Sequence, residues 1–194
     1  MAEQVREQLA VRAVPNRTAR RVAAVLAFAA LTALGARLSV PLPGMVPVTM
    51  QTLFVTLAGA MLGPYLGAAS QVVYLLAGIS GLPVFAMGSG LGYLFGPTGG
   101  YLLSYPLAAA LTGVLAGRTA DPNFMRGFVR IALAMLIASV LTLALGWAQL
   151  ALLTGNPERA LRAGVLPFIV GDLLKVALGA LIAQRARRQT LGLR

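Results

Sequence analysis

The sequence predicts an all-α integral membrane protein, a bundle of six transmembrane helices with the N- and C-termini in the cytoplasm. Hydrophobic residues make up 58% of the 194 residues and charged residues only 11%, whereas ordinary soluble domains carry about 25% charged residues. The apolar residues form long runs, and the arginines stand at the ends of these runs, as topology signals do. A soluble fold of this size could not bury so much apolar surface, whereas lipid can accept it.

The charge and the missing residue types exclude several functions. The formal net charge of +11 does not indicate a nucleic-acid partner, because nucleic-acid-binding proteins gather their basic residues on one face of a soluble core. The sequence has no Cys and no His, which excludes thiol nucleophiles, histidine acid–base catalysis and zinc sites with these ligands. We therefore expect no metal and no cofactor. No P-loop motif occurs, so a transporter driven by ATP would need partner subunits.

The N-terminal region is predicted to be a polar cytoplasmic tail, residues 1–21, followed by a first helix over 22–39. The pair Arg20-Arg21 before an apolar run also fits a twin-arginine export signal. Such a signal would deliver a soluble protein, and the rest of the chain is too apolar for one. The run is therefore a retained helix, and the prolines from Pro41 onward end it.

The second and third helices are predicted over 48–62 and 64–79, because Gly63-Pro64 separates them and proline suits a first helical turn. At about 1.5 Å per residue, both are short for a hydrocarbon core of about 30 Å.

The segment PLPGMVPVTMQT leads into the second helix and offers uncharged polar side chains. Its prolines stiffen the backbone, and Thr49, Gln51 and Thr52 supply these polar groups at the start of the helix. Helix capping alone would explain Thr49, since threonine is a fair N-cap residue.

Residues 81–100 contain seven glycines, two prolines and no charge. Long loops are usually functional or disordered, and disordered segments are polar, unlike this one. We expect the segment to pack back onto the bundle as a lid or re-entrant segment, because free irregular backbone cannot face lipid. A passive connector is the alternative.

The remaining helices are predicted over 100–116, 128–153 and 165–183, with a polar connection at 154–164. The membrane domain then covers 22–184, and a basic cytoplasmic tail follows at 185–194. With both termini in the cytoplasm, twelve arginines lie inside and three outside, which favours six spans under the positive-inside rule.

Two ionisable residues lie inside the last predicted span. Asp172 is the only acidic residue in any predicted span, and Lys175 is the only lysine of the chain. Each costs about 2.5–3.5 kcal/mol at mid-membrane, although the i, i+3 spacing lets them offset one another's charge. Phe168 lies one turn earlier on the same face. The pair indicates a site for a ligand with a carboxylate and N–H donors, and a structural ion pair is the alternative.

The first helix has alanines at four-residue spacing, Ala23 with Ala27 and Ala29 with Ala33. Small residues at this spacing allow helices to approach closely in lipid. The chain is rich in alanine, so such a pattern also arises by chance.

Four motifs in this order, PLPGMVPVTMQTLFVTLAGAMLG, GISGLPVF, LFGPTGGYLL and VLPFIVGDLLK, resemble the BioY family over about residues 22–184. Its members are biotin-binding S components of energy-coupling factor (ECF) transporters in the cytoplasmic membrane. The resemblance implies a six-helix subunit that binds biotin from outside, without a cofactor of its own. It also implies a transmembrane coupling subunit and two ATPase subunits as partners. Small residues on the first helix would form the docking face, for which Ala23, Ala27, Ala29 and Ala33 are the candidates.

The resemblance also carries residue roles. The family's Asp and Lys of the last helix correspond to Asp172 and Lys175. Many members have an amide after the GLPVF segment, where this chain has none, so Ser89 and Tyr93 are the substitutes considered for that contact. From the chemistry of biotin itself, we expect Gln51 and Tyr93 to complete a polar shell and Phe85, Tyr101 and Phe168 to supply apolar walls, with Thr49 as a further contact.

Three other functions remain open on the residues alone. The chain could be an S component for another vitamin, or a scaffold subunit that binds no small molecule. It could also be an intramembrane enzyme with Asp172 and Lys175 as acid and base.

Overall fold

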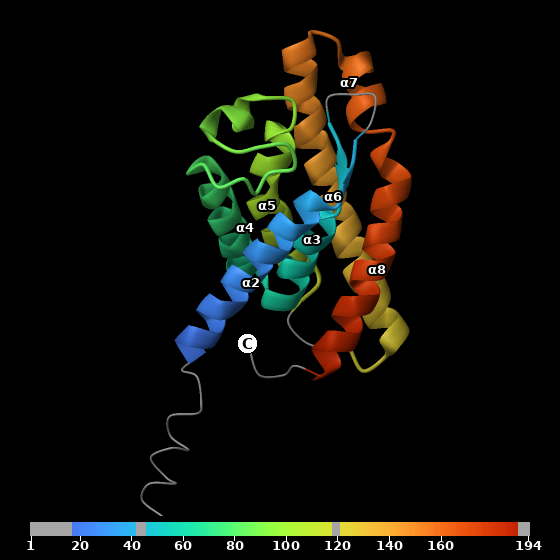
Figure 1. Ribbon diagram of the computed structural model, residues 1–194. Coiled ribbons are helices and arrows are strands. Elements are labelled where there is room, and N and C mark those ends of the chain that lie inside the picture. Colours follow the sequence, from blue (N-terminus) through green and yellow to red (C-terminus); the bar gives the residue numbers. More distant parts are fainter. Residues whose placement is uncertain (1–16, 42–45, 118–120, 190–194) are drawn as a thin grey trace, which may run out of the picture.

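Successive long helices run in opposite directions in the computed structural model, which describes residues 17–41, 46–117 and 121–189 (Figure 1). The elements are α2 (Arg17–Arg37), β1 (Ser39–Val40), β2 (Val48–Thr49), α3 (Gln51–Leu62), α4 (Pro64–Ile79), η1 (Leu91–Phe95), α5 (Gly99–Leu115), α6 (Phe124–Thr154), α7 (Pro157–Gly164) and α8 (Phe168–Gln189). The start of α2 and the end of α8 lie at one end of the bundle, here the tail end. The β strands, η1 and α7 lie at the opposite end, here the loop end (Figure 1).

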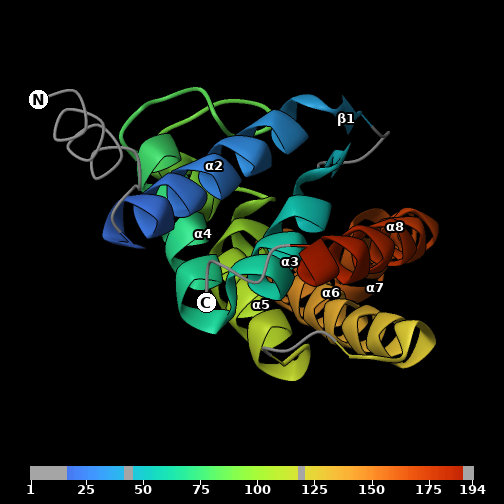
Figure 2. The ribbon, with the colours of Figure 1, turned by 90° about the horizontal axis from the view of Figure 1, so that it is seen from below.

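The helices pack around α3 and α5. Helix α5 packs against α3, α4 and α6, while α2 crosses α3 and α4 on one side (Figure 2). Helix α8 packs against α3 and α6 on the other side. Two large apolar clusters result, one between α2, α4 and α5 and one between α3, α6 and α8, and a third lies at the loop end.

Two helices, α2 and α6, are each long and apolar enough to cross a membrane, and α7 with α8, bent by 45°, is a third candidate. The described helices α3, α4 and α5 are apolar but shorter, with 12, 16 and 17 residues. The fold is therefore mostly helical, with one short hairpin, and helix length alone supports fewer than six full spans.

The first helix differs from the prediction at both ends. It begins at Arg17 rather than at residue 22, and it ends at Arg37 rather than at 39. Its first turn carries Arg17, Arg20 and Arg21, all exposed. Hydropathy marks only the apolar part of a helix, so it misses a charged turn that extends beyond the lipid. The rest of the predicted tail, residues 1–16, lies outside the described residues.

A short hairpin replaces the predicted start of the second helix. Ser39 pairs with Thr49 and Val40 with Val48 in an antiparallel ladder. Because Val48 and Thr49 are used as a strand, α3 begins only at Gln51. The sequence between them is rich in proline, which hides a strand signal.

The predicted boundaries of α4 are confirmed, and α5 begins one residue before the prediction. Helix α6 begins at Phe124, four residues before the prediction, because the Asn123 side chain accepts a hydrogen bond from the Arg126 amide and caps the helix. The polar connection predicted at 154–164 contains a helix, α7, which the Asn156 side chain caps in the same way.

The last helix begins at Phe168 rather than at 165 and continues to Gln189, well into the predicted tail. The residues before it, up to Pro167, form a turn. The tail residue Arg187 is therefore helical and buried at 4% exposure.

The glycine-rich segment packs back onto the bundle, as predicted, and is not a passive connector. Phe85 is completely buried and its ring lies on Gly78, where an added Cβ would come within 2.1 Å of the Phe85 ring. Rings of Tyr74 and Tyr93 contact Phe85 on either side, at centroid distances of 5.6 and 5.1 Å. Gly78 in α4 thus leaves the space that the Phe85 ring fills, and this contact holds the segment on the bundle.

Candidate ligand-binding site

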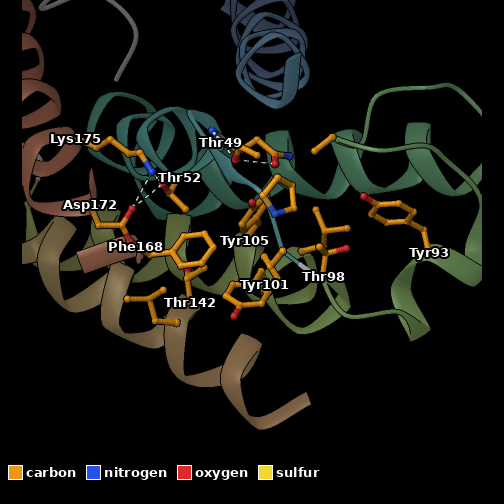
Figure 3. A pocket seen from close by; sticks show the side chains of 16 residues that line it. Thr49, Thr52, Tyr93, Thr98, Tyr101, Tyr105, Thr142, Phe168, Asp172 and Lys175 are labelled. Carbon is orange, nitrogen blue, oxygen red and sulfur yellow. Dashed lines mark hydrogen bonds and ion pairs between the residues drawn. The ribbon is translucent and has the colours of Figure 1, made fainter. Parts of the chain in front are cut away.

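A cavity of about 40 Å³ lies beneath the elements of the loop end (Figure 3). Its walls come from the hairpin, the glycine-rich segment and helices α3, α5, α6 and α8. The lining residues are Val46, Pro47, Thr49, Gln51, Thr52, Ala86, Tyr93, Thr98, Tyr101, Leu102, Tyr105, Thr142, Leu143, Phe168, Asp172 and Lys175.

Asp172 and Lys175 form a buried ion pair at one end of the cavity (Figure 3). Lys175 Nζ lies 2.9 Å from Asp172 Oδ1 and 3.2 Å from the Thr52 hydroxyl oxygen, which donates back to the same Oδ1 over 3.3 Å. The two residues are 5% and 7% exposed. An ion pair in this setting must be well hydrogen-bonded to offset its desolvation.

The ion pair has hydrogen-bonding groups that no described residue uses. All its contacts to Asp172 use Oδ1, so Oδ2 accepts no hydrogen bond from the described residues. The Lys175 ammonium uses two of its three N–H donors. Both groups line the cavity, where water or a polar ligand can bond to them.

A second polar group of the cavity, the Gln51 amide, is fixed by a chain of hydrogen bonds. The Thr49 hydroxyl donates to Gln51 Oε1 over 3.0 Å, and Gln51 Nε2 donates to the Tyr74 hydroxyl over 2.5 Å. Tyr74 donates in turn to the Val84 carbonyl over 3.1 Å. The chain connects the hairpin, α3, α4 and the glycine-rich segment, so it sets the orientation of Gln51.

Aromatic rings form the apolar wall. The rings of Tyr101 and Phe168 stack with centroids 6.0 Å apart, and the Tyr101 hydroxyl donates to the Gly164 carbonyl over 2.6 Å. Gly146 in α6 makes room for Tyr101, because an added Cβ would lie 2.2 Å from that ring. Tyr105 completes this wall (Figure 3). The cavity therefore joins an ionic end to an aromatic body.

The structure brings together seven of the nine predicted ligand contacts: Thr49, Gln51, Tyr93, Tyr101, Phe168, Asp172 and Lys175 all line the cavity. Phe85 does not, because its ring is used as the buried anchor of the glycine-rich segment. Ser89 does not either, because it lies exposed on the same segment. Ala86, between them in sequence, is the lining residue instead.

Several lining residues were not predicted as contacts. Thr52 was noted only as a polar residue near the helix start, although it bonds both members of the ion pair. Tyr105 and Thr142 lie on helices with other polar residues, and Thr98 precedes α5, so nothing in the sequence distinguished them as contacts.

The two alanine pairs of α2 differ in their exposure. Ala23 and Ala27 are exposed. Ala29 is 8% exposed and belongs to the apolar cluster between α2, α4 and α5, and Ala33 packs against that cluster. Only the first pair is free to meet a partner. Among the described residues, no three His, Cys, Asp or Glu side chains gather into a metal site.

Comparison with known proteins gives one consistent result. The sequence model of the BioY family matches residues 6–191. A probable biotin transporter BioY of Pyrococcus horikoshii is 40% identical over 89% of this chain and 99% of that protein. The biotin transporter BioY of Thermotoga maritima is 37% identical over 83% of this chain and 92% of that protein.

A solved structure has the same fold. It is the crystal structure of an S component for biotin from an ECF-type ABC transporter, with a TM-score of 0.80 and 24% sequence identity. The match covers 91% of this chain and 95% of that chain.

Proposed function

This chain belongs to the BioY family, and we propose on that premise that it takes up biotin as the substrate-binding subunit of an ECF-type ABC transporter. It is a transport protein and not an enzyme, so the acid–base role considered for Asp172 and Lys175 falls away. Its task is to capture the vitamin and to release it chemically unchanged.

The observation that carries this proposal is the ion pair with its unused hydrogen-bonding groups at the end of an aromatic cavity. Biotin has a ureido ring with two N–H donors and one carbonyl oxygen, an apolar thioether ring and chain, and a terminal carboxylate. Asp172 Oδ2 accepts a ureido N–H, and Lys175 keeps Asp172 ionised. The third N–H of Lys175 meets either the ureido oxygen or the tail carboxylate.

The shape of the cavity supports the arrangement in which Lys175 meets the ureido oxygen. Asp172 and Lys175 lie at one end, whereas Thr98 and Tyr93 lie toward the other, with the rings of Phe168, Tyr101 and Tyr105 between them (Figure 3). An elongated ligand with its ureido ring at the ion pair places its apolar body on the rings. Its carboxylate then meets hydroxyl donors at Thr98 and Tyr93.

For the membrane topology we infer six spans, with both termini in the cytoplasm and the cavity opening outward. The alternating direction of α2, α3, α4, α5, α6 and α8 supports this count (Figure 1). The excess of arginines at the tail end supports the orientation. In a bacterial or archaeal cell the protein then lies in the cytoplasmic membrane.

For the partners we infer a transmembrane coupling subunit that docks on the exposed alanines of α2, Ala23 and Ala27. Two ATPase subunits supply the energy, because this sequence has no nucleotide-binding motif of its own. No cofactor is required for binding.

The test is calorimetric binding to the detergent-purified chain, with biotin, desthiobiotin and biotinamide as ligands. Biotin binding is expected, and failure of the folded chain to bind it contradicts the proposal. Desthiobiotin keeps the ureido group and the carboxylate, so it should retain most of the affinity. Biotinamide distinguishes the two arrangements, because it loses affinity markedly only if Lys175 holds the carboxylate.

A further inference from the structure

The segment 82–96 exposes large apolar side chains although it has no regular helix long enough to span lipid. Leu82, Met87, Leu91 and Phe95 are 55%, 70%, 56% and 72% exposed. Residues 81–100 carry no charge. In a water-exposed loop, such a run of uncovered apolar side chains would be unfavourable.

The neighbouring helices expose large apolar side chains as well. Val72 and Leu76 on α4, which leads into the segment, are 43% and 58% exposed, and Leu103 and Leu107 on α5, which follows it, are 50% and 57% exposed. Seen from below, part of the segment lies outside the outline of α2 and α4 rather than over the centre of the bundle (Figure 2).

The helices next to the segment are too short to cross the bilayer. Helix α4 has 16 residues and α5 has 17, so they span about 24 and 26 Å. The hydrocarbon core is about 30 Å thick, and the headgroup regions extend it to about 40–45 Å. Since the segment continues both helices at the loop end, it occupies the depth that they do not reach.

Part of the backbone of the segment is hydrogen-bonded within the protein, which lowers the cost of placing it at membrane depth. Three side chains from three helices donate to its carbonyls: Arg37 to Pro83, Tyr74 to Val84, and Gln149 to Leu94 and Gly96. Backbone amides within the segment find acceptors as well. The Met87 amide donates to the Tyr93 hydroxyl. The other bonds join a backbone amide to a backbone carbonyl, and the pairs, amide first, are Val84 with Leu82, Phe85 with Gly88, Gly88 with Phe85, Gly90 with Gly78, Tyr93 with Gly90 and Gly96 with Tyr93.

The opposite rim of the loop end has the reverse character. Helix α7 exposes Glu158, Arg159 and Arg162, and an ion pair joins Glu158 to Arg162. In Figure 1, α7 and the glycine-rich segment lie on opposite sides of the loop end. The α7 side of the loop end therefore carries charged side chains beside the exposed Leu161, at 41%, whereas the glycine-rich segment carries no charge.

We propose that the segment 82–96 is immersed in the bilayer at the loop end, in the headgroup region and the adjoining hydrocarbon, while α7 stands in water. Lipid then covers one side of the roof of the cavity, and ligand enters from the α7 side. In the topology proposed above this is the outer leaflet. The inference concerns the depth of the segment and holds whichever ligand the cavity binds.

The test uses tryptophan fluorescence in liposomes. Trp147 is the only tryptophan, so a Trp147→Phe background is silent, and one tryptophan is added to it as Phe95→Trp or, as the matched control, Arg159→Trp on α7. Both proteins are measured with brominated lipids, which quench probes in the bilayer, and with acrylamide, which quenches probes in water.

The probe at position 95 should emit at shorter wavelength and lose more than about half of its intensity to brominated lipids, as expected for an aromatic ring at the interface. The probe at 159 should instead respond to acrylamide. Quenching of position 95 by acrylamide with no response to brominated lipids overturns the proposal. Equal quenching of both probes by brominated lipids overturns the asymmetry of the two rims. Thermal unfolding of each variant shows that the fold is kept.

Discussion

Gln51 and Tyr74 are joined inside the bundle by a hydrogen bond of 2.5 Å from the amide Nε2 to the phenol oxygen. The same hydroxyl donates to the Val84 carbonyl. One oxygen atom thus links a cavity residue on α3 to the glycine-rich segment that closes the cavity, through a side chain that is 1% exposed. The ring of Tyr74 itself does not line the cavity.

The substitution Tyr74→Phe therefore tests whether the hydroxyl holds the binding geometry. It keeps the ring against Phe85 but leaves the Gln51 amide and the Val84 carbonyl without this partner, at a cost of about 1–3 kcal/mol for each unsatisfied group. We expect a lower thermal unfolding temperature and faster hydrogen exchange at residues 84–90. Biotin should dissociate faster. Tyr65→Phe, at an exposed tyrosine of the same helix, should change none of these. Unchanged exchange in Tyr74→Phe would refute the link.

The ion pair allows a second prediction, which separates a ligand site from a structural contact. Asp172→Asn removes the negative charge from the site and leaves Lys175 buried without its counter-ion. Biotin affinity should fall about 10- to 100-fold, the equivalent of the 1.5–3 kcal/mol of a hydrogen bond to a charged group. The unfolding temperature should fall as well, because an unpaired buried charge is costly.

The double variant Asp172→Asn with Lys175→Met provides the control. It removes both charges, so the unfolding temperature should recover while calorimetric affinity stays low. If affinity recovers together with stability, the pair acts only through the fold, and the assignment of Asp172 as a biotin contact is wrong.

The sequence allowed prediction of those parts of the fold that follow from the apolar runs and their breaks. The boundary at Gly63-Pro64 and the ends of α4 are examples, because proline and glycine act on the local backbone. The ion pair could also be predicted, since two charged residues stand within an otherwise apolar run. The contact of Thr52 with both charges depends on α3 and α8 lying side by side, so only the fold could reveal it.

The predictions that were wrong also depended on contacts between residues distant in sequence. Residues 48 and 49 pair with a strand earlier in the chain, which helix propensity cannot anticipate. Phe85 was predicted as an apolar wall of the site. It is instead the anchor of the segment, because the space at Gly78 that its ring fills is created by a helix packed beside it.

A buried arginine at the tail end gives a third prediction. The Arg187 guanidinium donates to the carbonyls of Ala60, Ala116 and Gly117, at the C-terminal ends of α3 and α5, where a cation is favourable. Arg187→Met should lower stability by about 3 kcal/mol, because it leaves these acceptors unsatisfied. Arg187→Lys should recover only part of the lost stability, since an ammonium cannot reproduce the planar arrangement of N–H donors on the guanidinium.

Thermal unfolding in detergent measures the loss, and Arg185→Met is the matched control, because Arg185 is exposed on the same helix. Equal unfolding temperatures for the two methionine variants would show that Arg187 does not hold the helix ends together.

The exposed alanines of α2 give the last prediction, which concerns the proposed coupling subunit. Ala27→Trp places a large ring on the exposed face, so biotin binding by the isolated chain should be unchanged, while ATP-driven uptake with the ECF module should fall to the level of the chain alone. Leu76→Trp, on the exposed face of α4, should leave uptake intact. Ala29→Trp should fail to fold, because Ala29 is buried in the core. Full uptake by Ala27→Trp would exclude this face as the docking surface, since a helix could not approach a tryptophan as closely as an alanine.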